Sequence, residues 1–138
     1  MMTGATLLGS LTIPGRPEHV AEARVFAAQK LGVDCACADT VVLLICELVT
    51  NAVQHSNSRR DGGTITVTLI ATPDGIRAEV IDEGSATVPA LRPAPPEPAG
   101  LDEGGRGLQL VDMLSTRWSY CCDEAGTVTW FELTEPPA

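Results

Sequence analysis

The chain has 138 residues, of which 44% are hydrophobic, and its nine basic and eighteen acidic residues give a formal net charge of −9. That length and apolar content fit a single globular domain and exclude a wholly disordered chain. The negative field repels a phosphate backbone or an anionic bilayer, so we expect no direct nucleic-acid partner and no membrane partner.

The first part of the chain predicts one strand and two helices. Thr6–Ile13 has the composition of a strand and ends at a Pro-Gly pair. Pro17–Gly32 predicts a helix, because proline is favoured in a first turn and glycine commonly ends such an element. A second helix is expected from Asp39, as its N-cap, to about Ser56. It is apolar around much of its circumference, so it must be largely buried, as it would be against a sheet.

The middle of the chain predicts a β-hairpin followed by an irregular segment. Thr64–Ala71 alternates Ile, Val and Leu with Thr, and a Pro-Asp-Gly turn leads into a second strand at Ile76–Asp82. Residues 83–104 are rich in proline and alanine and show little periodicity. A segment of this length is typical of a lid or of a disordered stretch.

Three more elements are expected: a helix that begins near Gly105, and two strands at Arg117–Cys122 and Thr127–Leu133. The order strand, helix, helix, two strands, helix, two strands predicts an α+β two-layer sandwich. Its sheet is expected to be mixed or antiparallel, with the helices on one face. We interpret residues 1–138 as one domain whose ends, 1–5 and 134–138, fray.

Five cysteines are present, and none forms a Cys-x-x-Cys pair: Cys35, Cys37, Cys46, Cys121 and Cys122. The odd count and the lack of a cationic apolar leader predict a reducing, cytoplasmic setting. Cys46 falls inside the apolar second helix and is expected to be a small core residue. The spacing of the other four fits a zinc site poorly.

Three polar residues line one stripe of the second helix. Glu47, Asn51 and His55 are spaced at i, i+4 and i+8, so their side chains lie above one another. A carboxylate and an amide on a mostly buried helix need partners, because unpaired polar groups there cost a few kcal/mol each. The stripe is either solvated or part of a binding site, and the spacing alone fits both readings.

A second candidate position is Asp82, followed by Glu83 and Gly84. Strand alternation places Asp82 on the face that carries Ile76 and Val80, so a core-facing strand would aim this carboxylate into a pocket. There it could accept a hydrogen bond from an amino group such as that of adenine, while Gly84 lets the backbone turn close to a flat ligand. The alternative is a strand that ends in an ordinary turn.

A third motif, Gly104-Gly105-Arg106-Gly107, stands at the expected start of the last helix. Glycines at a helix N-terminus let backbone N–H groups approach an anion, and Arg106 could add a phosphate contact. Neither a P-loop nor a Rossmann glycine pattern occurs, and a flexible hinge is the alternative. In the last strand, Thr129 shares a face with Phe131. Its hydroxyl either is simply packed in the core or binds a partner, for which Asp82 or a nearby water is a candidate.

The order of these motifs resembles the GHKL ATPase superfamily, which includes gyrase and the histidine kinases. An acidic-amide helix, a strand ending Asp-x-Gly, a lid, a Gly-x-Gly helix start and a closing Thr strand follow one another. Within that superfamily the chain is most similar to the small anti-sigma regulatory serine kinases of actinobacteria. The likeness spans Leu11–Leu133, and its most specific stretches are Glu47–His55 and Gly104–Val111.

This resemblance implies a Bergerat ATP-binding fold with ATP and Mg²⁺ as cofactors. Glu47 corresponds to the general base and Asn51 to the Mg²⁺ ligand, and residues 85–104 correspond to the ATP lid. A small nucleotide is compatible with an acidic protein, because backbone N–H groups and Mg²⁺ supply a local positive field. The positions implied to bind the cofactors are Asn51, His55, Asp82, Gly84, Ala86, Gly105, Arg106, Gly107, Leu108 and Thr129.

The function implied is that of a serine/threonine protein kinase and anti-sigma factor, which phosphorylates an anti-anti-sigma (STAS-type) partner. A sigma factor is the second implied partner, and a homodimer is compatible with the resemblance. Two departures favour the alternative of a non-catalytic module that binds ATP or sequesters proteins. Ala86 occupies the second glycine position of the Asp-x-Gly-x-Gly box, and the proline-rich lid has no lysine.

Overall fold

The structure, a computed structural model, describes residues 4–56, 58, 60–84, 103–123 and 125–134; for residues 103–107 it describes the backbone. The predicted lid, including Ala86, lies outside these residues except for its last two positions. The elements in chain order are β1 (Thr6–Pro14), a short 3-10 helix η1 (Pro17–His19), α1 (Val20–Leu31), α2 (Ala38–His55), β2 (Thr64–Thr72), β3 (Gly75–Asp82), α3 (Glu103–Leu114), β4 (Arg117–Asp123) and β5 (Gly126–Thr134).

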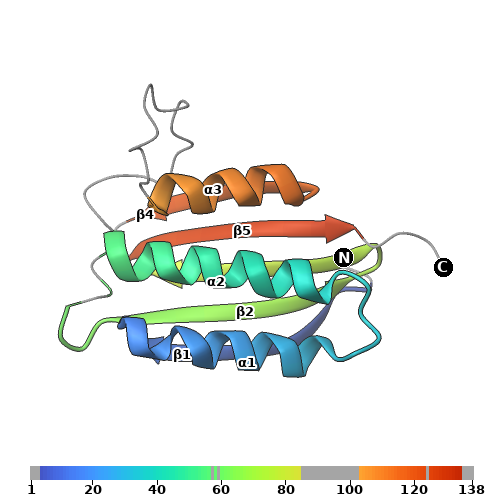
Figure 1. The fold of residues 1–138 in the computed structure, drawn as a ribbon, viewed down its shortest axis with the longest axis horizontal. Helices are drawn as coiled ribbons and strands as arrows, with labels where there is room; N and C mark the ends of the chain where they lie inside the picture. Colours follow the sequence, from blue (N-terminus) through green and yellow to red (C-terminus); the bar gives the residue numbers. More distant parts are fainter. Residues whose placement is uncertain (1–3, 57, 59, 85–102, 124, 135–138) are drawn as a thin grey trace.

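The strands form one five-stranded sheet in the order β1-β2-β3-β5-β4. Every neighbouring pair is antiparallel, so of the two sheet types expected from sequence the antiparallel one is present. The three helices lie on one face of this sheet (Figure 1). The predicted α+β two-layer sandwich is therefore confirmed.

The alternation predicted for the hairpin sets which face of the sheet carries the core. Ile65, Val67 and Leu69 of β2 are fully buried beneath the helices. The intervening threonines point to the open face, where the hydroxyls of Thr12 and Thr66 lie 2.9 Å apart. An apolar inner face and a polar outer face follow directly from a period of two residues.

Helix α2 is central to the core, and seven of its residues are buried: Val41, Leu44, Ile45, Leu48, Val49, Ala52 and Val53. Helix α1 packs beside it and contributes Ala23 and Ala27, both with no exposed surface. Small side chains at these two positions allow the helices to approach closely. α2 in turn contacts β2, β3 and α3, so it connects most of the fold.

Two sequence expectations about α2 are corrected by the structure. The helix begins at Ala38 with Cys37 as its N-cap, not with Asp39. The Ala38 N–H bonds to the Cys35 carbonyl at 3.2 Å, and this turn starts the helix early and leaves Asp39 in the first turn, where a negative charge is favourable. Cys46 is half-buried and is not one of the core residues, although burial raises the pKa of its thiol.

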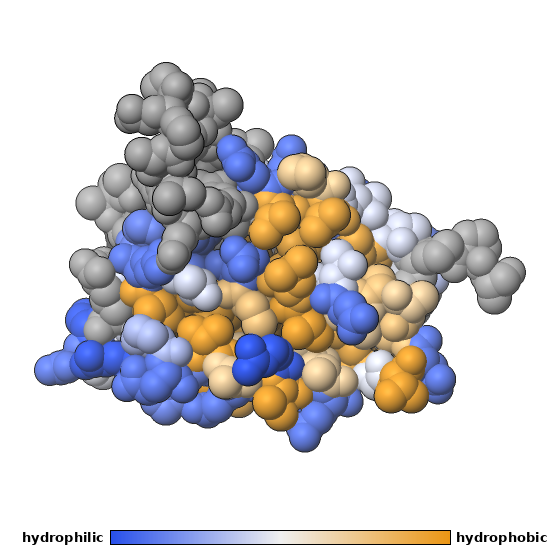
Figure 2. Space-filling model, in the orientation of Figure 1, coloured by the Kyte–Doolittle hydropathy of each residue, from blue (hydrophilic) through white to orange (hydrophobic). Residues whose placement is uncertain are grey.

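Hydrophobic side chains also gather on the outer surface of the helix layer, over α2 and α3 (Figure 2). Among the described residues, exposed large apolar side chains include Leu43 of α2 and Met113 and Leu114 of α3. None of the described helices is both long and apolar enough to cross a bilayer. The part of the chain that the structure describes contains no cluster of three or more metal-binding His, Cys, Asp or Glu side chains.

Candidate functional site

The three sequence motifs meet at one end of the sandwich. Figure 1 shows that the C-terminal end of α2, the end of β3 and the start of α3 lie at the same end of the molecule. The antiparallel pairing of β3 with β5 brings the start of β5 to this end as well. The fold therefore places residues from four separate segments near one another.

On α2, the predicted polar stripe is only partly covered. Glu47 and Asn51 are half-buried and His55 is exposed. Neither Glu47 nor Asn51 makes a side-chain hydrogen bond or ion pair with any described residue. Their flanking helix residues, including Leu48 and Ala52, are buried in the core. The helix thus holds a carboxylate and an amide one turn apart on the same face.

Asp82 ends β3 on the core face, in line with the buried residues Ala78 and Val80. Burial raises the pKa of its carboxyl group above the ordinary value. Backbone N–H groups of Gly84 and Thr127 donate to the carboxylate and partly oppose that rise, the Gly84 bond being 2.6 Å long. Asp82 is therefore a half-buried acceptor held in a fixed direction at the edge of the core.

Two glycines allow the chain to close around Asp82. Gly84 has a φ of +82°, in the left-handed region that favours glycine. Gly126 lies opposite, and a Cβ atom on it would stand 2.0 Å from the Asp82 carbonyl oxygen. Only glycine fits there. The sequence analysis identified Gly84 but missed Gly126, whose position in a short Asp-Glu-Ala-Gly turn marked it only as a turn residue.

The glycine motif lies where the sequence placed it. Gly104, Gly105, Arg106 and Gly107 form the first turns of α3, whose backbone is helical from Glu103. A helix start of this kind presents unpaired backbone N–H groups and the positive end of the helix dipole. Leu108, the next residue, is buried in the core with 6% of its surface exposed, so it anchors the helix start to the rest of the fold.

The last predicted site residue, Thr129, is buried on β5. The strand register pairs it with Val80, whereas Asp82 pairs with Thr127. The direct contact to the Asp82 carboxylate from this strand is consequently made by the Thr127 backbone N–H, two residues before Thr129. A link between Thr129 and Asp82 through water stays a prediction.

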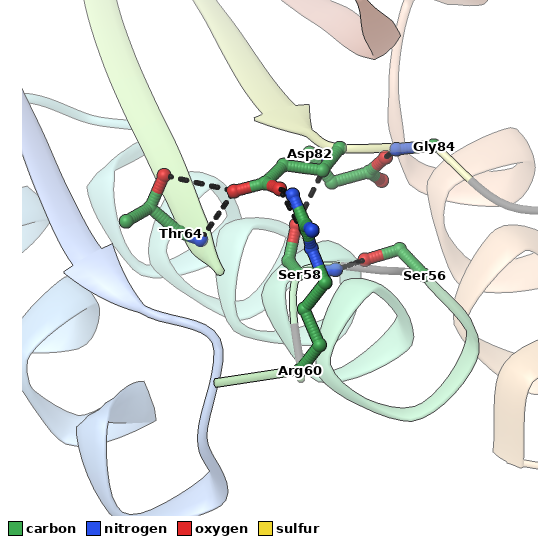
Figure 3. A network of polar contacts seen from close by, with 7 residues as sticks. Ser56, Ser58, Arg60, Thr64, Asp82 and Gly84 are labelled. Atoms are coloured by element: carbon green, nitrogen blue, oxygen red, sulfur yellow. Dashed lines mark hydrogen bonds and ion pairs between the residues drawn. The ribbon is translucent and has the colours of Figure 1, made fainter. Parts of the chain in front are cut away.

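A polar network behind Asp82 was not anticipated from sequence (Figure 3). Ser56 and Ser58, just after α2, form hydrogen bonds with each other, and the Ser58 hydroxyl accepts the Glu83 N–H at 2.8 Å. The Glu83 carboxylate accepts hydrogen bonds from Arg60 and from the Thr64 N–H. These bonds lower the pKa of Glu83, that from Arg60 most strongly. The signal in the sequence was the Ser-x-Ser pair after the helix.

Comparison with known proteins agrees with this arrangement. The chain is 26% identical over 129 residues to the serine-protein kinase RsbW of Listeria monocytogenes serotype 4a (strain HCC23), with 86% of this chain and 82% of that protein covered. It is 28% identical over 114 residues to the serine-protein kinase RsbW of Oceanobacillus iheyensis, with 75% and 72% covered.

The fold is similar to that in the crystal structure of the RsbU and RsbW domains of Rv1364c from Mycobacterium tuberculosis. The TM-score is 0.65 at 23% identity, with 94% of this chain covered. This chain spans 34% of that longer protein. The model of the histidine kinase-like ATPase domain matches residues 13–133, which include all of the site segments described above. The chain therefore belongs to the histidine kinase-like ATPase domain family.

Proposed function

We propose that this protein is an ATP-dependent serine/threonine protein kinase that also acts as an anti-sigma factor. The observation that carries the proposal is the placement of Asp82. A half-buried, desolvated carboxylate sits beside two close-packed glycines, at the same end of the fold as Asn51 and the glycine-rich start of α3. A carboxylate acceptor suits the adenine amino group, an amide oxygen suits Mg²⁺, and the backbone N–H groups of a helix start suit the phosphates.

Asp82 would recognise the adenine base. Its carboxylate is already oriented by the N–H groups of Gly84 and Thr127, and it retains lone pairs that can accept a hydrogen bond from the exocyclic amino group. Burial makes such a bond stronger than it would be in water. Gly84 has no side chain to obstruct a flat ring beside this carboxylate.

The Asn51 side chain fits an Mg²⁺ ligand. Its amide is half-buried and makes no hydrogen bond to the described residues, and its oxygen is of the hard type that Mg²⁺ prefers. Bound Mg²⁺ would neutralise charge on the phosphates during transfer. The backbone N–H groups at the start of α3, with Arg106, would hold the phosphates themselves.

The Glu47 carboxylate would act as general base. It stands one helical turn from Asn51 and is free of hydrogen bonds within the described part of the chain. From there it would accept the proton of an attacking serine hydroxyl while the hydroxyl oxygen bonds to the γ-phosphorus and the ADP oxygen leaves.

A protein partner is supported by the surface of the helix layer, where Leu43 and Met113 expose apolar area. The relatives named serine-protein kinases support a serine-bearing protein substrate. We propose an anti-anti-sigma protein as substrate and a sigma factor as the second partner. Ala86, in the second glycine position, supports the alternative of a non-catalytic ATP-binding module.

Two variants test the proposal by separating binding from transfer. Asp82→Asn should weaken ATP binding about tenfold or more, since Asn keeps only one uncharged acceptor oxygen and its NH2 group would face a donor, either the adenine amino group or the N–H groups of Gly84 and Thr127. Glu47→Ala should keep ATP affinity but lose transfer of labelled phosphate to a serine-bearing anti-anti-sigma protein. Asp74→Asn, in the exposed turn at the other end of β3, is the control.

The outcomes are distinct. Full ATP affinity in Asp82→Asn contradicts the adenine assignment. ATP binding without transfer to any of several serine-bearing partners favours the non-catalytic module.

A further inference from the structure

A continuous chain of hydrogen bonds joins α2 to the end of β3. The Ser56 hydroxyl donates to the Ala52 carbonyl at 2.6 Å, and the Ser58 N–H donates to the Ser56 oxygen at 3.0 Å. The Ser58 hydroxyl in turn accepts the Glu83 N–H at 2.8 Å. Ala52 directly follows Asn51, and Glu83 directly follows Asp82. The chain therefore links the two residues assigned to Mg²⁺ and adenine through their backbone neighbours (Figure 3).

These hydrogen bonds hold the chain just beyond the last residue pair of the β2–β3 ladder. The register of β3 with β2 ends at the pair Ile81 and Thr66, so Asp82 and Glu83 have left the β2 ladder. The hydrogen bonds that hold Glu83 on that side come from outside the ladder: its N–H donates to the Ser58 hydroxyl, and its carboxylate accepts from the Thr64 N–H at 2.7 Å and from Arg60. The direction of the Asp82 carboxylate thus depends on these bonds as well as on β5.

Ser58 itself has no room to move. It has no exposed surface. A Cβ atom on Gly15 would lie 2.1 Å from the Ser58 carbonyl oxygen, and one on Gly63 would lie 2.2 Å from it. Gly15 and Gly63 are also joined to each other by a backbone hydrogen bond of 3.1 Å. The two glycines therefore pack closely against the Ser58 backbone, and the Ser58 hydroxyl is a buried acceptor.

We propose that Ser58 is a positioning residue for nucleotide recognition. It fixes the separation between the Asp82 carboxylate and α2, so that one nucleotide engages both ends of the site. The inference rests on the proposed function, because it concerns how the same site selects its base. A purine with an amino group at position 6 benefits from the fixed carboxylate, whereas one with a carbonyl group there does not.

The test measures binding of ATP and of inosine triphosphate, whose base has the carbonyl group, by calorimetry with Mg²⁺. We expect Ser58→Ala to weaken ATP binding about tenfold, which corresponds to about 1.4 kcal/mol, and to leave inosine triphosphate nearly unchanged. The preference for adenine then falls by the same factor. Ser10→Ala, which removes a hydroxyl 3.4 Å from that of Thr68 on the open face of the sheet, is the matched control.

An equal loss of affinity for both nucleotides, which leaves the ratio of the two affinities unchanged, would show a purely structural role and overturn the inference. Unchanged affinity for both nucleotides would also overturn it. If the Ser58→Ala variant does not fold, the Ser56→Ala variant is used in its place. It removes the hydroxyl between the Ala52 carbonyl and the Ser58 N–H, and it should lower the ratio of ATP affinity to inosine triphosphate affinity. An unchanged ratio in a folded Ser56→Ala variant then overturns the inference.

A double-mutant cycle separates the two proposals. In an Asp82→Asn background, Ser58→Ala should have no further effect on the nucleotide ratio. If Asp82→Asn alone leaves the ratio of wild type unchanged, the adenine assignment fails and the role of Ser58 fails with it. If Asp82→Asn removes the preference but Ser58→Ala does not lower it, the adenine assignment stands and the positioning role alone is wrong.

Discussion

At the scale of single residues, Asp82 has opposing effects on the stability of the fold and on the proposed binding of adenine. Its carboxyl group is half-buried, whereas the proposed hydrogen bond from the adenine amino group is strongest to the charged carboxylate. Burial raises the pKa of Asp82, whereas the N–H groups of Gly84 and Thr127 work against that rise. Burial of the charged form is thus unfavourable for the fold, and carboxyl groups with perturbed pKa values are common in binding sites.

This conflict predicts opposite pH dependences for stability and for ATP affinity. Because the folded-state pKa of Asp82 is raised above its ordinary 3.8, its contribution to stability is fully present below the unfolded value and is lost as pH rises through the folded one. ATP affinity should change the other way, rising with pH as the carboxylate forms. Calorimetric titrations with ATP from about pH 4 to about pH 7 measure this.

The Asp82→Asn variant should bind ATP weakly, with a flatter profile, while Asp74→Asn should keep the wild-type profile. Suppose that the ATP affinity of the wild type stays constant as the pH is lowered toward the ordinary pKa of a carboxyl group. Asp82 is then not the acceptor.

The site residues differ in how far the sequence revealed them. Glu47, Asn51 and Asp82 could be proposed from the sequence because helical and strand periodicity places them on definite faces. Ser58 and Gly126 were not found, because their roles depend on contacts between segments distant in sequence, at Glu83 and at the Asp82 carbonyl. Short serine and glycine turns carry no periodicity, so no local pattern distinguishes them from ordinary loops.

At the scale of elements, the hydrophobic pattern was sufficient for every strand and for the three longer helices. β2 was predicted because its Thr alternation is regular, and α2 because its apolar residues surround most of the helix. The start of α2 was predicted two residues too late, with Asp39 instead of Cys37 as the N-cap, since the turn from Cys35 to Ala38 replaces a side-chain cap with a backbone bond. Helix ends depend on such local geometry more than helix interiors do.

Alanine substitutions at three glycines should lower the free energy of unfolding by different amounts. The differences depend on how closely each glycine approaches other atoms, above all where β3 ends and β5 begins. Gly62→Ala meets no atom within 4 Å, so it should cost only the strain of a positive φ, about 1 kcal/mol. Gly84→Ala should cost a similar amount, because its Cβ would meet Gly126 at an ordinary 3.4 Å. Gly126→Ala adds a collision with the Asp82 carbonyl and should cost about 3 kcal/mol or more.

Urea denaturation of the three variants measures these costs. Equal losses at the three positions would contradict the close approach of the two strand ends. ATP binding adds a second readout, since Gly126→Ala displaces the Asp82 backbone and should weaken binding, whereas Gly62→Ala should not.

At the scale of the whole molecule, the fold is compatible with the proposed binding of a triphosphate by an acidic protein. The chain carries a net charge of −9, so bulk electrostatics oppose the ligand. The antiparallel order β1-β2-β3-β5-β4 with helices on one face brings the start of α3, Asn51 and Asp82 to one end of the sandwich. In the proposed complex, backbone dipoles at the start of α3 and a bound cation would supply a local positive field around the phosphates.

ATP should therefore stabilise the whole domain in an Mg²⁺-dependent way. A ligand present at about 100 times its Kd adds about 2.7 kcal/mol to a fold that binds it only when native. For a domain of this size that stabilisation should raise the Tm by roughly 8–10 °C, measurable by thermal melting with and without ATP.

Chelation of Mg²⁺ should remove most of the shift in the wild type. Asn51→Ala should show the smaller shift whether or not Mg²⁺ is present, because the cation would have lost its protein ligand. Asp74→Asn, in the exposed turn at the other end of β3, should keep the full Mg²⁺-dependent shift and is the control. If Asn51→Ala keeps the full Mg²⁺-dependent shift, the cation is held elsewhere, and the role of α2 in ATP binding must be reassigned.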